Sequence, residues 1–195
     1  HRTHFASAVP QLTRQAMAEY SALTGRHYSP VHAYDCEDAD YVMVGLWSVG
    51  DDVRAVLPHL RSLGLKVGLV SVKLLQPFPE AEVVEALRGA KAVTVLERSD
   101  QTALTALVTQ ALFRGHENAH AGVVRHEGIP AIEQLPVLTT AIFGLGGHDL
   151  QPRHLIAACQ NMAQGSPAPL VYLGSQFFDP AAQGRLAEVQ ERLRA

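Results

Sequence analysis

The residues His116-Glu117-Asn118-Ala119-His120 match the H-E-x-x-H pattern of zinc hydrolases. On a helix, the two imidazoles would lie on one face and bind Zn²⁺, while the glutamate would activate the metal-bound water. Gly115 directly precedes the motif, and Gly122 follows it closely. We therefore expect the preceding helix to stop at Gly115 and the motif to lie in a solvated loop between a helix and a strand.

The surrounding sequence also lacks what a zinc enzyme needs for its remaining ligands. The extended spacing of the metzincins, with a third histidine after a glycine, is missing. Glu127 and Glu133 are available as third ligands, but they follow the motif too closely to come from a second helix. We predict that His116 and His120 do not converge on a zinc ion and that the chain has no metal site.

A glycine-rich segment, residues 144–149, is the second candidate for chemistry. It runs Gly144-Leu145-Gly146-Gly147-His148-Asp149 and lies between an expected strand and an expected helix. Such a turn can hold a phosphate through its backbone N–H groups. It matches neither G-x-G-x-x-G nor a Walker A motif. A tight strand-to-helix turn, with Asp149 near the cap and Pro152 near the first helical position, is the favoured interpretation.

Charged residues and cysteines add little further chemistry. Glu97 and Arg98 follow an expected strand, where α/β folds place ligand contacts, and we interpret them as rim or interface residues. No G-x-S-x-G motif is present to support a serine hydrolase. Cys36 and Cys159 are far apart and no CxxC occurs, which argues against a disulfide scaffold, a thiolate zinc site and an iron–sulfur cradle.

The composition excludes several classes of protein. The 195 residues are 47% hydrophobic and 18% charged, and the net charge is −3. This balance argues against disorder, collagen, coiled coil and a nucleic-acid partner. No apolar run is long enough to span a membrane, and we expect a cytoplasmic protein. The first residue is His, so we interpret the chain as processed or as a piece of a longer protein.

Short Val-rich runs alternate with amphipathic segments, which predicts a mostly parallel sheet covered by helices on both faces. The expected strands cover residues 40–46, 66–73, 92–96, 122–124 and 139–143. The expected helices begin near residues 51, 80, 102 and 152. We assign residues 39–165 to one α/β domain, residues 1–38 to an N-terminal helical extension or linker, and residues 166–195 to a C-terminal extension toward a neighbour.

Four segments of the chain together resemble a known family. They are residues 63–69, which lead into Val72-Lys73-Leu74-Leu75-Gln76-Pro77-Phe78-Pro79; Val95-Leu96-Glu97-Arg98; Phe143 to Pro152; and Thr24-Gly25-Arg26-His27-Tyr28 ahead of the first strand. In order and spacing they resemble the second core domain of the pyruvate:ferredoxin (2-oxoacid:ferredoxin) oxidoreductases. The resemblance covers residues 17–162. It implies a transketolase C-terminal-like fold, a three-layer α/β/α sandwich with a five-stranded, mostly parallel sheet.

The resemblance also implies a function for the parent enzyme. That enzyme would oxidatively decarboxylate a 2-oxoacid such as pyruvate to acyl-coenzyme A, using thiamine diphosphate and iron–sulfur clusters, and pass electrons to ferredoxin or flavodoxin. This domain would be an interface between other domains or subunits, would bind no cofactor alone, and would be inactive in isolation. The alternative is a non-catalytic interaction or small-ligand module that has kept the fold.

Two departures from the family pattern limit what the resemblance implies about individual residues. Trp47 stands where the family commonly has a glycine, and only Arg98 remains of a usually charged loop. We therefore carry over no catalytic residue. We expect a partner interface at the carboxyl ends of the strands, built from Trp47, Arg98, Gly144, Gly146, Gly147, His148 and Asp149.

Overall fold

A computed structural model of the chain describes residues 8–175, 181 and 183–194. The strands are β1 (Val31–Tyr34), β2 (Tyr41–Leu46), β3 (Val67–Val72), β4 (Ala92–Glu97), β5 (Val137–Ile142) and β6 (Leu170–Tyr172). The helices are α2 (Val9–Thr24), α3 (Ser48–Ser62), α4 (Glu80–Leu87), α5 (Ala103–His120), α6 (Pro152–Met162) and α7 (Arg185–Arg194). The C-terminal extension assigned to residues 166–195 lies partly outside the described residues.

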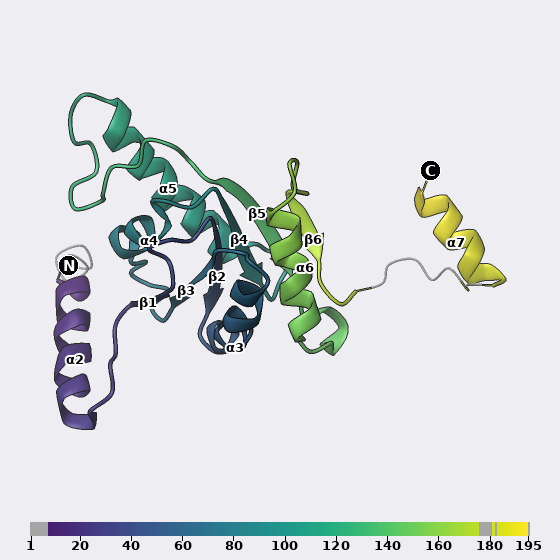
Figure 1. Cartoon of the computed structure of the whole chain (residues 1–195), viewed down its shortest axis with the longest axis horizontal. Coiled ribbons are helices and arrows are strands. Elements are labelled where there is room, and N and C mark those ends of the chain that lie inside the picture. The colour runs from purple at the N-terminus through teal and green to yellow at the C-terminus, as the bar shows by residue number, and fades with distance from the viewer. Residues whose placement is uncertain (1–7, 176–180, 182, 195) are drawn as a thin grey trace.

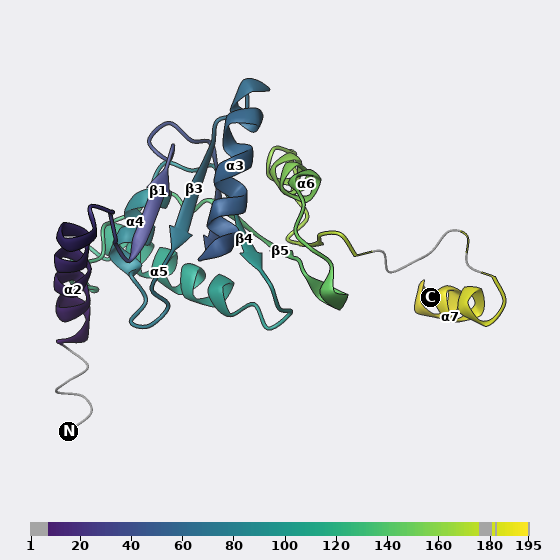
Figure 2. The same ribbon diagram turned by 90° about the horizontal axis from the view of Figure 1, so that it is seen from below.

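The six strands form a single sheet in the order β1-β3-β2-β4-β5-β6. β1 is antiparallel to β3, and the other neighbouring strands are parallel. Every residue of β3 and β4 is buried, because both faces of the sheet are covered. Helices α3 and α6 pack together on one face, and α4 and α5 pack together on the other (Figures 1 and 2). The three-layer α/β/α fold predicted from the sequence is confirmed.

The sheet has six strands rather than the predicted five. β1 and β6 lie outside residues 39–165, one on each side, and form the two edges of the sheet. They are short and only partly buried, so they lack the continuous apolar run of the central strands. This explains why the sequence pattern did not reveal them.

The helix expected to stop at Gly115 continues to His120, so that prediction is wrong. A Cβ on Gly115 would lie 2.9 Å from the carbonyl oxygen of Pro130 and 3.0 Å from Cγ2 of Ile132. The N–H of Ile132 also donates to the carbonyl of Gly115. Glycine is therefore required here because another segment packs against the helix, and it does not end the helix.

The strand expected at Gly122–Val124 is also absent; these residues form a loop. Asn118 holds the loop that follows. Its side-chain oxygen accepts from the N–H groups of Arg125 and His126, and its side-chain nitrogen donates to the carbonyls of His126 and Ile129. Val123 and Val124 are exposed and have no sheet neighbour among the described residues. An apolar pair of residues alone is therefore insufficient for a strand.

The remaining features of the fold concern its helices. The N-terminal helix α2 has no buried residue among those described, and an ion pair between Arg14 and Glu82 joins it to α4. No helix in residues 8–175, 181 or 183–194 is both long and apolar enough to cross a lipid bilayer.

Candidate functional site

The segments that follow β2, β4 and β5 lie along one edge of the sheet, because these strands are parallel neighbours. Trp47 follows β2, Arg98 follows β4 and Gly144 follows β5. The topology therefore places all of the predicted interface residues at the carboxyl edge of the sheet.

Arg98 and the glycine turn are in contact. The position that a Cβ would take on Gly144 is 3.4 Å from Cγ of Arg98, so the arginine side chain lies along the turn. Arg98 is exposed and forms no ion pair with any residue that the structure describes. Its guanidinium group is available for a carboxylate or phosphate from a partner.

The glycine turn has a backbone that other residues rarely adopt. Gly144, Gly146 and Gly147 have φ angles of 78°, 65° and 79°, and the turn includes a short 3₁₀ segment. The His148 ring packs on Gly146, while His148 and Asp149 are exposed. The reciprocal hydrogen bonds of Gln151 and His154 cap the following helix, and Pro152 at its start has no N–H to offer a ligand. The geometry fits a tight strand-to-helix turn.

Glu97 serves the fold at this edge. Its side chain is 6% exposed, and its Oε1 accepts a 2.6 Å hydrogen bond from the N–H of Thr105 in the first turn of α5. The carboxylate thus satisfies an otherwise unpaired donor at a helix N-terminus, where negative charge is favourable. Glu97 therefore points inward and caps α5, whereas Arg98 is exposed to solvent.

Trp47 occupies a strained backbone position between β2 and α3. Its φ is 47° and its ψ is −116°, a combination that glycine adopts far more readily than tryptophan. The carbonyl of Trp47 accepts a hydrogen bond from Nζ of Lys73. The side chain is 62% exposed and is therefore not part of the hydrophobic core.

An apolar groove separates Trp47 from helix α2. The groove has a volume of about 530 Å³, and we call it the Trp47 groove; it is lined by Leu12, Thr13, Ala16, Met17, Tyr20, Tyr28 and Trp47. Leu12 and Tyr20 are exposed large apolar residues, like Trp47 itself. The structure thus brings Arg98 together with the glycine turn, while Trp47 faces α2 instead.

The H-E-x-x-H motif lies on helix α5 and not in a loop, which corrects the sequence prediction. The rings of His116 and His120 are 4.1 Å apart between centroids. Glu117 is directed elsewhere, since its carboxylate pairs with Arg125 at 3.1 Å and with His126 at 2.8 Å. Hydrogen bonding from these two side chains lowers the pKa of Glu117. The glutamate is therefore not positioned to activate a water between the two histidines.

No set of side chains in the described part of the chain fits an iron–sulfur cluster or a metal ion with three or more protein ligands. Both cysteines are free, and they belong to the two opposite apolar layers of the sheet. Burial raises the pKa of the Cys36 thiol and of the Cys159 thiol to about 11 in each case, which disfavours the thiolate that a metal needs. No group of three or more metal-binding side chains occurs among the residues described.

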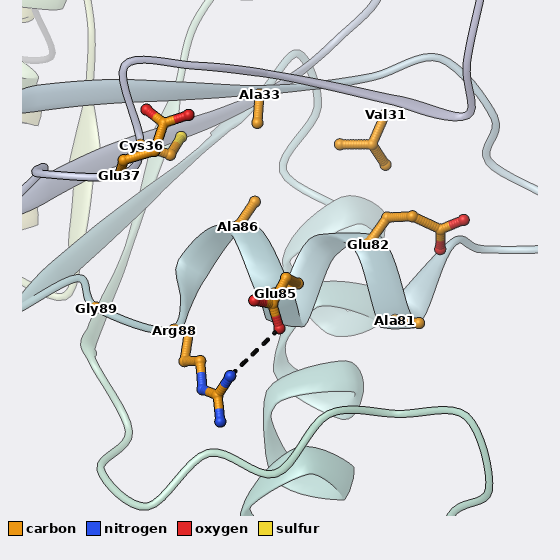
Figure 3. A pocket seen from close by; sticks show the side chains of 10 residues that line it. All are labelled: Val31, Ala33, Cys36, Glu37, Ala81, Glu82, Glu85, Ala86, Arg88 and Gly89. Carbon is orange, nitrogen blue, oxygen red and sulfur yellow. Dashed lines mark ion pairs between the residues drawn. The ribbon is translucent and has the colours of Figure 1, made fainter.

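A second groove lies between the edge strand β1 and helix α4 (Figure 3). Its volume is about 760 Å³, and its walls carry Val31, Ala33, Cys36, Glu37, Ala81, Glu82, Glu85, Ala86, Arg88 and Gly89. No sequence motif marks this groove, because it depends on the pairing of β1, which the apolar pattern did not show.

A family model and the similar curated proteins indicate the same family for this chain. The family described as pyruvate:ferredoxin oxidoreductase core domain II matches residues 39–155. The pyruvate synthase subunit PorA of Thermotoga maritima is 30% identical over 148 residues, which are 76% of this chain and 34% of that protein. PorA of Methanothermobacter thermautotrophicus is 33% identical over 145 residues, or 74% of this chain and 33% of that protein.

A solved structure supports the same fold. A 2-oxoglutarate:ferredoxin oxidoreductase from Magnetococcus marinus superposes with a TM-score of 0.51 at 23% identity, over 74% of this chain and 21% of that chain. At this identity the likeness concerns the fold alone. The chain thus spans about a third or less of the length of these relatives.

Proposed function

Because the chain belongs to the pyruvate:ferredoxin oxidoreductase core domain II family, we propose that it is an interface domain of a thiamine diphosphate-dependent 2-oxoacid:ferredoxin oxidoreductase. The whole enzyme would convert a 2-oxoacid such as pyruvate and coenzyme A to acyl-coenzyme A and carbon dioxide, and would pass two electrons to ferredoxin or flavodoxin. The names of the relatives, pyruvate synthase subunit and pyruvate-flavodoxin oxidoreductase, support this assignment.

The chemistry of that reaction belongs to other parts of the enzyme. This chain supplies no set of thiolates for a cluster, and its carboxylates Glu97 and Glu117 are engaged in holding helix α5 and its following loop. Its own role is to present surfaces that neighbouring domains bind. The two free thiols, Cys159 buried and Cys36 half-buried, suit the reducing cytoplasm in which such an enzyme would work.

The observation that carries this proposal is the exposed Trp47. A tryptophan in a glycine-like backbone conformation is unfavourable for the isolated domain, and binding of a neighbour at this edge would offset that cost. An exposed Trp beside an apolar groove has the composition of an interface anchor. Arg98 and the glycine turn extend the same edge with a cation and a tight backbone turn, and both can fix the register of a docked neighbour.

The test is an assay of the intact oxidoreductase that contains this domain. With pyruvate, thiamine diphosphate and coenzyme A supplied, we expect ferredoxin or viologen to be reduced by the intact enzyme and not by the isolated chain. Other 2-oxoacids tested in parallel identify the substrate. An intact enzyme that oxidises no 2-oxoacid, or an isolated chain that reduces ferredoxin, contradicts the proposal.

A further inference from the structure

Strand β1 leaves part of its backbone unpaired at the sheet edge. In an antiparallel pair, the residues alternate between positions bonded to the partner strand and positions facing outward. The N–H of Lys73 in the segment after β3 donates to the carbonyl of Pro30, which fixes the alternation. With Val31 opposite Val72, the backbone N–H and C=O groups of His32 and Tyr34 point toward β3. The backbone groups of Val31 and Ala33 point away from β3.

The outward backbone groups border the groove between β1 and α4. Val31 and Ala33 line this groove, and Figure 3 shows their side chains pointing toward α4, with Ala86 pointing back from the helix. Ala33 is exposed, and neither its N–H nor its carbonyl has a hydrogen-bond partner in the described part of the chain. The hydroxyl of Ser29 already donates to the Val31 carbonyl. The groove thus offers unpaired main-chain donors and acceptors next to small side chains.

The groove carries more acidic than basic side chains. Glu37, Glu82 and Glu85 line it, with Arg88 as the basic lining residue. Arg88 lies 3.6 Å from Glu85, and this pair is drawn in Figure 3. Arg14 from α2 bonds Oε1 of Glu82, while Oε2 has no hydrogen-bond partner among the described residues. Glu37 is exposed and forms no ion pair with any described residue, so a lysine or arginine side chain that enters beside it would meet complementary charge.

We propose that the groove between β1 and α4 binds an extended segment, carrying a lysine or arginine, from another part of the same oxidoreductase. The segment pairs with the outward edge of β1 as an additional strand, and its basic side chain lies beside Glu37. This inference rests on the proposed function, because the occupant comes from the rest of that enzyme. An unpaired strand edge can pair with other chains and promote aggregation. A bound segment would occupy the unpaired backbone groups of β1 and so prevent this pairing.

The length of the related polypeptides and the charge of the groove point to the rest of the enzyme as the source of the bound segment. The chain spans 34% of the length of the PorA relative, so most of such a polypeptide lies outside it and can supply the segment. A second copy of this chain is a poor occupant: pairing two β1 edges would bring two acidic grooves together, and β1 itself contains neither lysine nor arginine.

Amide hydrogen exchange, measured at single residues, tests the proposal in the intact enzyme. We expect the amides of Val31 and Ala33 to exchange at least about 100-fold more slowly in the assembled enzyme than in the isolated chain. The amides of His32 and Tyr34 serve as internal controls, because they face β3 and should be protected in both samples. Equal, fast exchange of Ala33 in both samples would overturn the proposal.

Substitutions separate strand pairing from charge. Ala33→Pro removes the outward N–H and should abolish the protection of Val31, whereas Ala33→Val retains that N–H and should preserve it. Glu37→Gln should reduce the protection of Ala33, and Glu133→Gln, an exposed glutamate outside this groove, should leave it unchanged. Protection that is indifferent to Glu37→Gln contradicts the basic occupant.

A photo-crosslinking residue placed at position 33 identifies what lies in the groove. Crosslinks to a basic segment elsewhere in the oxidoreductase support the proposal, and crosslinks to a second copy of this chain or to no polypeptide overturn it. If the intact enzyme oxidises a 2-oxoacid while Ala33 still exchanges freely, this inference fails and the proposed function stands. If no 2-oxoacid is oxidised but Ala33 is protected, the proposed function fails alone.

Discussion

Replacing Trp47 with alanine removes the one tryptophan of the chain from the carboxyl edge of the sheet while leaving the backbone angle in place. The side chain is 62% exposed, so on a total of about 200 Å² docking would bury about 120 Å² more. At about 25 cal/mol per Å², this area corresponds to about 3 kcal/mol as an upper limit. We therefore expect Trp47→Ala to weaken association with the neighbouring domain by about 1–3 kcal/mol, or about 5- to 150-fold in Kd.

The same substitution should change the stability of the isolated domain little, because most of the ring has no contact to lose. Trp47→Gly provides a sharper test of the strain. Glycine relieves an unfavourable φ worth about 1–3 kcal/mol, at a cost of about 0.5–1 kcal/mol in chain entropy. We expect Trp47→Gly to be more stable than Trp47→Ala by about 1 kcal/mol, while both bind the neighbour equally weakly.

The assay combines urea denaturation of the isolated chain with calorimetric titration of the chain into the remaining domains of the oxidoreductase. Phe113→Ala is the matched control, since Phe113 is an exposed aromatic residue on α5, away from the Trp47 groove. A large loss of stability with unchanged association would assign Trp47 to the core of the domain. That result would refute the interface.

Three further outcomes are expected. After chelator treatment and dialysis, elemental analysis should find no tightly held zinc, because Glu117 pairs with Arg125 and His126; one zinc per chain, lost in His116→Ala, would contradict this. Glu97→Ala should lower the free energy of unfolding by about 1–3 kcal/mol, and Glu97→Gln by less, since an amide oxygen can still accept from Thr105; equal losses would argue against capping. Burial lowers the pKa of His154 below its ordinary 6.5, so the unfolded chain binds more protons at this ring than the folded chain does just below pH 6.5. The free energy of unfolding therefore falls as the pH drops below 6.5. An NMR titration of the His154 ring in the folded chain can check the lowered pKa.

The buried parts of the fold followed from the sequence because their signal is strong. β3 and β4 are buried on both faces, so a continuous Val-rich run identifies them without further context. The partly exposed edge strand β1 has no such run, and its pairing with β3 depends on the folded chain. The position of the β1–α4 groove therefore could not be predicted from sequence patterns.

Gly115 shows why local rules misplaced a helix end. Glycine often follows the last turn of a helix, but here it allows the segment at Pro130 and Ile132 to approach α5 closely. That requirement is set by residues distant in the sequence. The carboxyl-edge placement of Trp47 and Arg98, by contrast, follows directly from a parallel sheet.

We propose that this chain contributes docking surfaces to a 2-oxoacid:ferredoxin oxidoreductase whose chemistry lies in its other domains. The most direct test mixes the purified chain with an oxidoreductase preparation lacking it, then measures co-elution on a sizing column and pyruvate-dependent ferredoxin reduction in the same fractions. The account predicts that the chain joins the complex and that ferredoxin reduction rises with its occupancy, while the chain alone shows none. Ferredoxin reduction by the chain alone, or full reduction by the preparation without it, would contradict the claim.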